Sequence, residues 1–172
     1  YVSSSSQSSD FPTVGASQSA LNGTQDAVIL KMNTGLSNLI WSTYFGGSQL
    51  ESGNSIQIAS NGNIFVTGGT NSSNLPVIAG NDLTFNGGIS DGFLVKFNGA
   101  TSTQLAGTYI GQGEYDQSFF VQLDLDDNVY VYGQTETAWP ISPGKYGNSN
   151  AGQFIRKYDN ILQTVFWTTM IG

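Results

Sequence analysis

The chain has 172 residues, neither cysteine nor histidine, and a formal net charge of −7 at pH 7. This composition excludes disulfides, zinc–thiolate sites and every catalytic arrangement that needs cysteine or histidine. The negative charge argues against nucleic acids and anionic membranes as partners, and no apolar run approaches the roughly 20 residues of a membrane helix. We therefore expect no nucleic-acid binding, no direct membrane insertion and no cofactor.

Three landmarks recur in constant order along the chain. They are a proline at positions 12, 76 and 140, a segment ending in lysine at residues 26–31, 91–96 and 152–157, and a segment ending in glycine at residues 41–46, 106–111 and 167–172. The prolines are 64 residues apart. Self-similarity at a fixed period indicates a repeat protein.

The first unit begins inside a strand at residues 1–6, and a long polar loop follows. The middle unit contains four segments rich in Val, Ile, Phe, Tyr and Thr and bounded by turn residues, which predict strands at residues 54–60, 63–70, 91–98 and 104–111. Asn61-Gly62 joins the first two and is a strong hairpin signal, because both turn positions favour positive φ. In the third unit Asp126-Asp127 stands at this turn, so the signal is weaker there.

Several predicted strands are apolar on both faces, namely Val28-Ile29-Leu30, Phe93-Leu94-Val95 and Val129-Tyr130-Val131. A sheet with one solvated face would alternate apolar and polar residues, so these strands should be covered on both sides. Helical repeats fit poorly, because no segment shows a sustained 3.6-residue stripe and the chain contains 22 glycines. The pattern predicts an all-β fold, a partial β-propeller whose blades have four antiparallel strands.

Two segments of the middle unit carry a resemblance to a known family. Asp91-Gly-Phe-Leu-Val-Lys-Phe-Asn98 and Asn61-Gly-Asn-Ile-Phe-Val-Thr-Gly-Gly-Thr70 resemble the SBBP type of bacterial β-propeller repeat, and the resemblance extends over almost the whole chain. It implies that the hairpin ending in Val-Thr-Gly forms the two inner strands of a blade. It also implies a secreted or cell-surface protein with roles such as adhesion or protein binding, often exported by type IX secretion.

On this basis residues 1–47 supply strands two to four of an incomplete blade, residues 48–112 a complete blade, and residues 113–172 a third blade. Closed propellers use about four to eight blades. We therefore expect this chain to be part of a longer polypeptide whose remaining blades are its partners, and the total number of blades stays open.

The loops on one face of the propeller are the expected place for recognition. The candidate ligand-binding residues are Phe85, Trp139 and Tyr146 in the long loops after strand two, with Glu51, Tyr115 and Asp116 in the loops that enter each blade. Aromatic side chains suit a glycan or protein ligand. Because Phe11, Leu75 and Trp139 each directly precede the repeated proline, they are alternatively structural plugs beneath their own loops.

Glu51 and Asp116 occupy equivalent repeat positions. Repeated carboxylates around an axis suit a hard cation, but hydrogen bonds from loop amides are the simpler interpretation, and no metal site is expected. The repeated lysines, Lys31, Lys96 and Lys157, are interpreted as exposed edge residues or as partners of a carboxylate in the neighbouring blade. Trp41 and Trp167 match each other and should pack in the outermost strand of their blades.

The composition and the repeat favour a non-enzymatic binding or scaffold module. One alternative is part of a carbohydrate-active hydrolase or lyase, because paired carboxylates such as Glu51 and Asp116 suit glycoside cleavage. Another is a structural segment captured in a surface or secretion assembly, with the incomplete first blade accepting a strand from another chain. The ligand, the oligomeric state and the export route stay open.

Overall fold

The computed structural model describes residues 1 to 172. It consists of β-strands and loops, and it has no helix that could cross a membrane. The strands are β1 (Val2–Ser6), β2 (Asp26–Met32), β3 (Leu39–Phe45), β4 (Glu51–Ile58), β5 (Ile64–Thr70), β6 (Asp91–Phe97), β7 (Gln104–Ile110), β8 (Asp116–Leu123), β9 (Val129–Thr135), β10 (Gln153–Tyr158) and β11 (Val165–Ile171).

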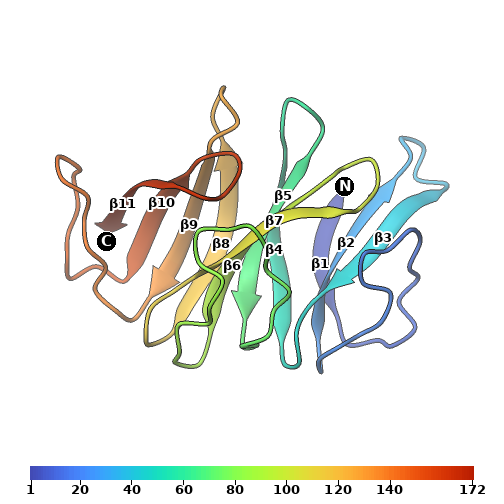
Figure 1. The fold of residues 1–172 in the computed structure, drawn as a ribbon, viewed down its shortest axis with the longest axis horizontal. Helices are drawn as coiled ribbons and strands as arrows, with labels where there is room; N and C mark the ends of the chain where they lie inside the picture. Colours follow the sequence, from blue (N-terminus) through green and yellow to red (C-terminus); the bar gives the residue numbers. More distant parts are fainter.

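The strands form three antiparallel sheets in which each strand pairs with its neighbour along the chain (Figure 1). The first sheet contains β1, β2 and β3, the second contains β4 to β7, and the third contains β8 to β11. The first sheet has no strand equivalent to β4 and β8. The predicted all-β class and the partial propeller are therefore confirmed.

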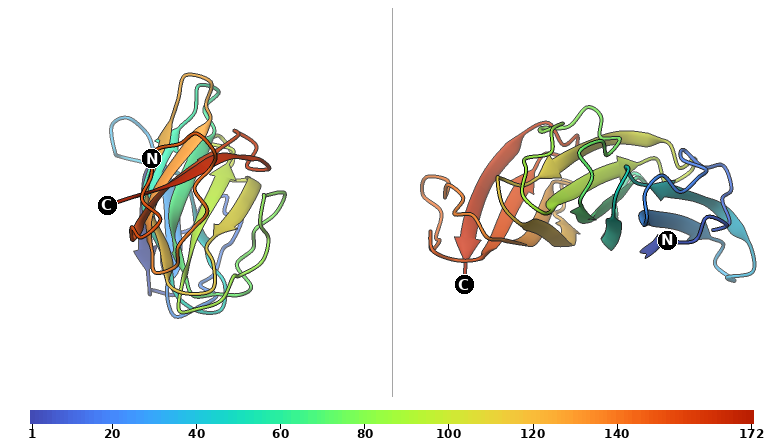
Figure 2. Two further views of the ribbon diagram at one scale, coloured as in Figure 1. Left: turned by 90° about the vertical axis from the view of Figure 1, so that its left-hand side faces the viewer. Right: turned by 90° about the horizontal axis from the view of Figure 1, so that it is seen from below.

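The three sheets follow an arc and do not close into a ring (Figure 2). The first core lies between the first two sheets and includes Ile29, Trp41 and Phe45 packed with residues of β5 and β6. The second core lies between the second and third sheets and includes Phe65, Leu94 and Val131. All seven residues of β5 are buried, which explains why this strand is apolar or small at every position.

The two inner hairpins turn in the same way despite their different sequences. Gly62 has φ +82° and Asp127 has φ +60°. The amide of Gly62 donates to Ala59 O at 2.9 Å, and the amide of Asp127 donates to Asp124 O at 3.0 Å. Aspartate tolerates the left-handed region better than most residues, so the third unit keeps the turn without glycine.

The first strand of each complete blade begins earlier than the sequence predicts. β4 starts at Glu51, not at residue 54, and β8 starts at Asp116. The pairing of β4 with β5 shifts register between Gly53 and Ser55, which indicates a bulge, and β8 has the same irregularity. The prediction that Glu51 and Asp116 lie in entry loops is therefore wrong, because the bulge lets three further residues pair.

The long loops and the entry loops lie on one face, as predicted. The amide of Ser48 in an entry loop donates to Asn74 Oδ1 at 2.9 Å, and the amide of Gln49 donates to Ser72 Oγ at 2.8 Å. These contacts fix the entry loop of the second sheet against its own long loop.

Candidate functional site

Two pairs of buried carboxylates mark the points where one blade passes into the next. Asp26 and Glu51 both approach Gly46, and Asp91 and Asp116 form the equivalent pair near Gly111. All four acids are 0% exposed. Glu51 and Asp116 therefore each face the acid that opens the third strand of the preceding blade.

The buried acids bind the loops that surround them. Glu51 accepts hydrogen bonds from Thr70 Oγ1 at 2.7 Å and from the amide of Gly47 at 2.8 Å. Asp116 accepts from the amide of Gln112 at 2.6 Å. The interpretation that these carboxylates hold loop amides is confirmed, and burial raises the pKa of both.

Asp91 and Asp116 are less well satisfied than Asp26 and Glu51, because each keeps a buried Oδ1 without a hydrogen-bond partner. The Oδ2 of Asp91 accepts from the amide of Asn86 at 2.7 Å. Burial, together with the nearby charge of Asp116, raises the pKa of Asp91 to about 7. The Asp91 carboxyl is thus a proton-binding group near neutral pH.

The arrangement offers little to a metal ion. No group of three or more His, Cys, Asp or Glu side chains that could hold a metal is present. The sequence-based idea that Glu51 and Asp116 act together across the axis also finds no support, since each interacts with a different acid.

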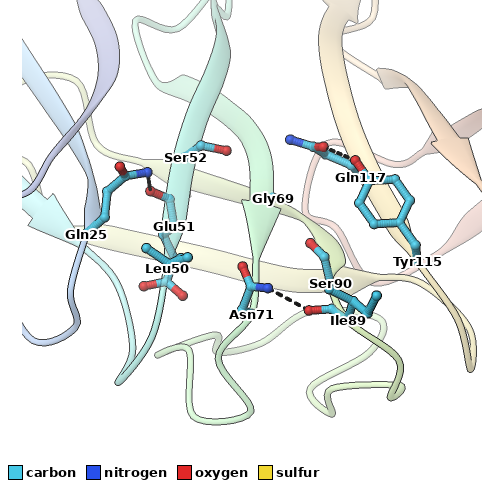
Figure 3. A pocket seen from close by; sticks show the side chains of 10 residues that line it. All are labelled: Gln25, Leu50, Glu51, Ser52, Gly69, Asn71, Ile89, Ser90, Tyr115 and Gln117. Carbon is cyan, nitrogen blue, oxygen red and sulfur yellow. Dashed lines mark hydrogen bonds between the residues drawn. The ribbon is translucent and has the colours of Figure 1, made fainter.

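A pocket of about 230 Å³ opens where β4 and β5 approach the start of β8 (Figure 3). Successive side chains of a strand point to opposite faces, so residues on either side of the buried acids turn toward this opening. The lining residues are Gln25, Leu50, Glu51, Ser52, Gly69, Asn71, Ile89, Ser90, Tyr115 and Gln117.

The pocket is lined by amides, hydroxyls and one aromatic ring. Tyr115 donates its hydroxyl hydrogen to Gln117 Oε1, and Asn71 Nδ2 donates to the carbonyl of Ile89 at 2.6 Å. Nε2 of Gln117 and Oδ1 of Asn71 make no hydrogen bond within the protein, so a donor and an acceptor remain available to a ligand.

Gly69 creates the space for this pocket. A Cβ at Gly69 would stand 3.1 Å from Cγ and from Nε2 of Gln117. Gln134 occupies the equivalent position in the third blade, and Glu136 stands where the second blade has Asn71. The third blade therefore lacks the residues that line this pocket in the second blade.

Two of the six predicted binding residues line the pocket. Tyr115 lies directly before β8 and lines the pocket with its ring (Figure 3). Glu51 lines the pocket at the first position of β4. Asp116 is 0% exposed and Phe85 packs edge-on against Tyr109 with ring centroids 6.0 Å apart. Tyr146 is 88% exposed, but it is not among the residues that line the pocket.

Trp139 is a structural plug and does not face solvent. It is 2% exposed and stacks on Phe154, with ring centroids 4.2 Å apart and an interplanar angle of 20°. Leu75 is similarly buried beneath its loop. The plug interpretation is therefore confirmed for Trp139 and Leu75, and the alternative of Trp139 as a ligand contact is wrong, because its side chain fills the space under the loop.

Sequence reasoning missed the polar residues of the pocket, above all Gln25, Asn71 and Gln117. A signal was present: Gln25 directly precedes Asp26, and Gln117 directly follows Asp116. Where an acid is buried at a strand end, its neighbours point to the opposite side. This signal becomes usable only once the structure shows that the acids are buried.

Comparison with known families supports the architecture. Residues 40–76 match the family SBBP, described as a beta-propeller repeat. This segment is similar to an SBBP repeat. It runs from the end of the first sheet through the whole β4–β5 hairpin, so the resemblance inferred from the Val-Thr-Gly hairpin is confirmed there. No curated protein matches the chain.

Proposed function

We propose that this chain is a non-enzymatic binding module of a secreted or cell-surface bacterial β-propeller protein, and that its pocket beside Gly69 takes one unit of a neutral glycan. The pocket lining supports the proposal. It combines free amide groups with the ring of Tyr115, and it offers hydroxyl groups of a sugar both a donor and an acceptor.

The size of the pocket favours a small ligand group. At about 230 Å³ it lies below the roughly 300–1,000 Å³ typical of sites for drug-sized molecules. One sugar ring fits such a volume with one face on an aromatic side chain. The rest of an oligosaccharide would extend over the adjacent loops.

The state of Glu51 argues against the hydrolase alternative. Both carboxylate oxygens accept hydrogen bonds from within the protein, and the side chain is 0% exposed. A general acid or nucleophile needs to reach the bond that it cleaves. Glu51 therefore serves better as a support for the pocket wall.

A location outside the cytoplasm is supported by composition. Charged residues make up only 10% of the chain, and glycine is abundant at 22 residues. This surface resembles that of exported bacterial proteins. Protease resistance in culture medium and detection of the native protein at the cell surface would support this part of the proposal.

The test is binding to an array of neutral oligosaccharides, followed by titration calorimetry on any glycan that binds. Tyr115→Ala and Gln117→Ala should weaken binding about tenfold or more, a loss of roughly 1.4 kcal/mol. Tyr146→Ala is the matched control, because it removes an exposed tyrosine that does not line the pocket. Binding that survives both pocket variants would sink the proposal, and cleavage abolished by Glu51→Gln would replace it with an enzyme.

A further inference from the structure

One backbone carbonyl joins the first sheet to the second. Gly99 O, in the turn between β6 and β7, accepts hydrogen bonds from Tyr1 Oη at 2.8 Å, Trp41 Nε1 at 2.9 Å and Lys31 Nζ at 3.1 Å. The three donors come from β2, β3 and the residue before β1. They converge on a single atom of the next blade.

The junction between the second and third sheets keeps one of these contacts. Lys96 Nζ donates to Asn160 O at 2.7 Å, and Asn160 follows Lys157 by the same three residues by which Gly99 follows Lys96. Phe65 and Ala106 stand at the other two donor positions and cannot donate. The lysine therefore marks a repeated interblade contact with a turn carbonyl, where an exposed edge residue or a partner of a neighbouring carboxylate was expected.

The third sheet restores all three donors on its outward face. Tyr130, Lys157 and Trp167 occupy the positions of Tyr1, Lys31 and Trp41, and together they are called here the donor triad.

The geometry of the donor triad matches that of the first sheet. The rings of Tyr130 and Trp167 are 5.7 Å apart, compared with 5.9 Å for Tyr1 and Trp41. The ammonium of Lys157 lies 4.8 Å from the Tyr130 ring centroid, and that of Lys31 lies 5.1 Å from the Tyr1 ring.

The surface around the donor triad has the character of an interface. Phe120 is 60% exposed, and Tyr132 and Ile155 are half-buried beside it. The residues equivalent to Tyr130 and Ile155 in the second sheet, Phe65 and Leu94, are 0% exposed because the third sheet covers them.

Lys157 also contacts an acid that the other blades lack. Its Nζ lies 2.8 Å from Asp124 Oδ2, and alanine occupies the equivalent position in the second blade. An ammonium group has three N–H donors. The ion pair therefore holds Lys157 in place and leaves donors for a further acceptor.

We propose that the outward face of the third sheet is a docking surface for a further blade of this repeat type. The donor triad would bind the carbonyl at the Gly99 position of that blade, in the turn between its third and fourth strands. The two interfaces already in the chain supply the pattern for this contact.

The occupant should resemble the second blade. A Cβ at Gly99 would stand 2.1 Å from Gly62 O in its own blade and 2.6 Å from the Tyr1 hydroxyl, so a glycine is favoured at this position opposite a tyrosine such as Tyr130. The first blade of a second copy is a poorer match, because it has Thr34 at this position and lacks the strand equivalent to β4. The chain alone should therefore remain monomeric.

The experiment appends a second copy of residues 47–111 after Gly172, which gives the chain a fourth blade. The appended segment contains no tryptophan, so the protein keeps the three indole N–H groups of Trp41, Trp139 and Trp167. Hydrogen exchange of each group is followed by NMR. In the original chain Trp41 should exchange slowly and Trp167 fast, and the fourth blade should slow exchange of Trp167 by about tenfold or more.

Variants of the extended chain separate the donor triad from general apolar contact. Tyr130→Phe and Lys157→Met should restore part of the fast exchange at Trp167, whereas Tyr132→Phe, on the same face but outside the donor triad, should not. Unchanged exchange at Trp167 overturns the proposal, and so does failure of the fourth blade to fold beside three intact sheets. Sedimentation of the original chain completes the test: a dimer that protects Trp167 would make a second copy the occupant and overturn the assignment.

Discussion

Gly111 lies directly against the carboxyl group of Asp91, where an added Cβ would stand 2.6 Å from Asp91 Cγ. Gly46 has the same relationship to Asp26, with 2.3 Å to Cγ, and Glu51 Oε2 lies 2.6 Å from the same point. A glycine follows the last strand of each of these two blades because a buried carboxyl group occupies the space that a Cβ would need. This arrangement couples the blade junctions to the acids that support the pocket.

We predict that Gly111→Ala destabilises the protein by about 1–3 kcal/mol, the usual cost of overpacking a filled site. Gly113→Ala is the matched control, because its Cβ would meet nothing within 4 Å, and it should change the free energy of unfolding by less than about 0.5 kcal/mol. Urea unfolding followed by circular dichroism measures both. Equal costs for the two variants would show that the Gly111 site has room for a methyl group.

A second prediction concerns the pH dependence of stability. The pKa of Asp91 rises from an ordinary 3.8 to about 7 on folding, so between about pH 4 and pH 7 the folded protein binds more protons than the unfolded chain. The free energy of unfolding should therefore fall as the pH rises through this window. Asp91→Asn removes the titration and should flatten this fall.

The measurement is the urea midpoint of the protein and of Asp91→Asn at intervals from pH 4 to pH 8. Asp91→Asn also removes the electrostatic repulsion between Asp91 and Asp116, and this effect is included in the difference between the two curves. Asp126→Asn, at an exposed turn residue, should leave the shape of the curve unchanged. Parallel curves for the protein and Asp91→Asn would contradict the prediction.

The repeat explains why so much of the fold follows from sequence. The turn at Asn61-Gly62 and the recurring prolines mark where strands end in each unit, so strand order and sheet composition could be inferred. The start of β4 at Glu51 could not be predicted, because Ser52 and Gly53 have the composition of a loop, and only the register with β5 shows a bulge.

The pocket was harder to predict because it depends on differences between repeats. Tyr115 attracted attention as a single aromatic residue in an entry loop, and it does line the pocket. Gln25 and Asn71 have ordinary polar character, and their position becomes informative only once Gly69 is seen to leave space beside Gln117. Trp139 was ambiguous for a different reason. A large aromatic residue in a loop fits both a ligand site and a structural plug.

The plug interpretation gives a third prediction. Trp139→Ala should destabilise the protein by about 3–5 kcal/mol, because it removes a fully packed aromatic side chain and leaves a cavity beside Phe154. Tyr146→Ala, in the same loop but 88% exposed, should cost less than about 0.5 kcal/mol. Thermal unfolding of the two variants distinguishes them, and a small loss for Trp139→Ala would mean that the loop collapses without its plug.

The fourth prediction compares two tryptophans in equivalent strands. Trp41→Phe removes a buried donor to Gly99 O and should destabilise the protein by about 1–3 kcal/mol, although Tyr1 and Lys31 continue to donate to the same carbonyl. Trp167→Phe should change the free energy of unfolding by less than about 0.5 kcal/mol, because its indole N–H has no partner in this chain. Urea titration at one pH compares the midpoints, provided that the slope of unfolding free energy against urea is unchanged. Equal losses would show that Trp167 already contributes a buried contact, and a negligible loss for Trp41→Phe would show that the shared carbonyl does not need its third donor.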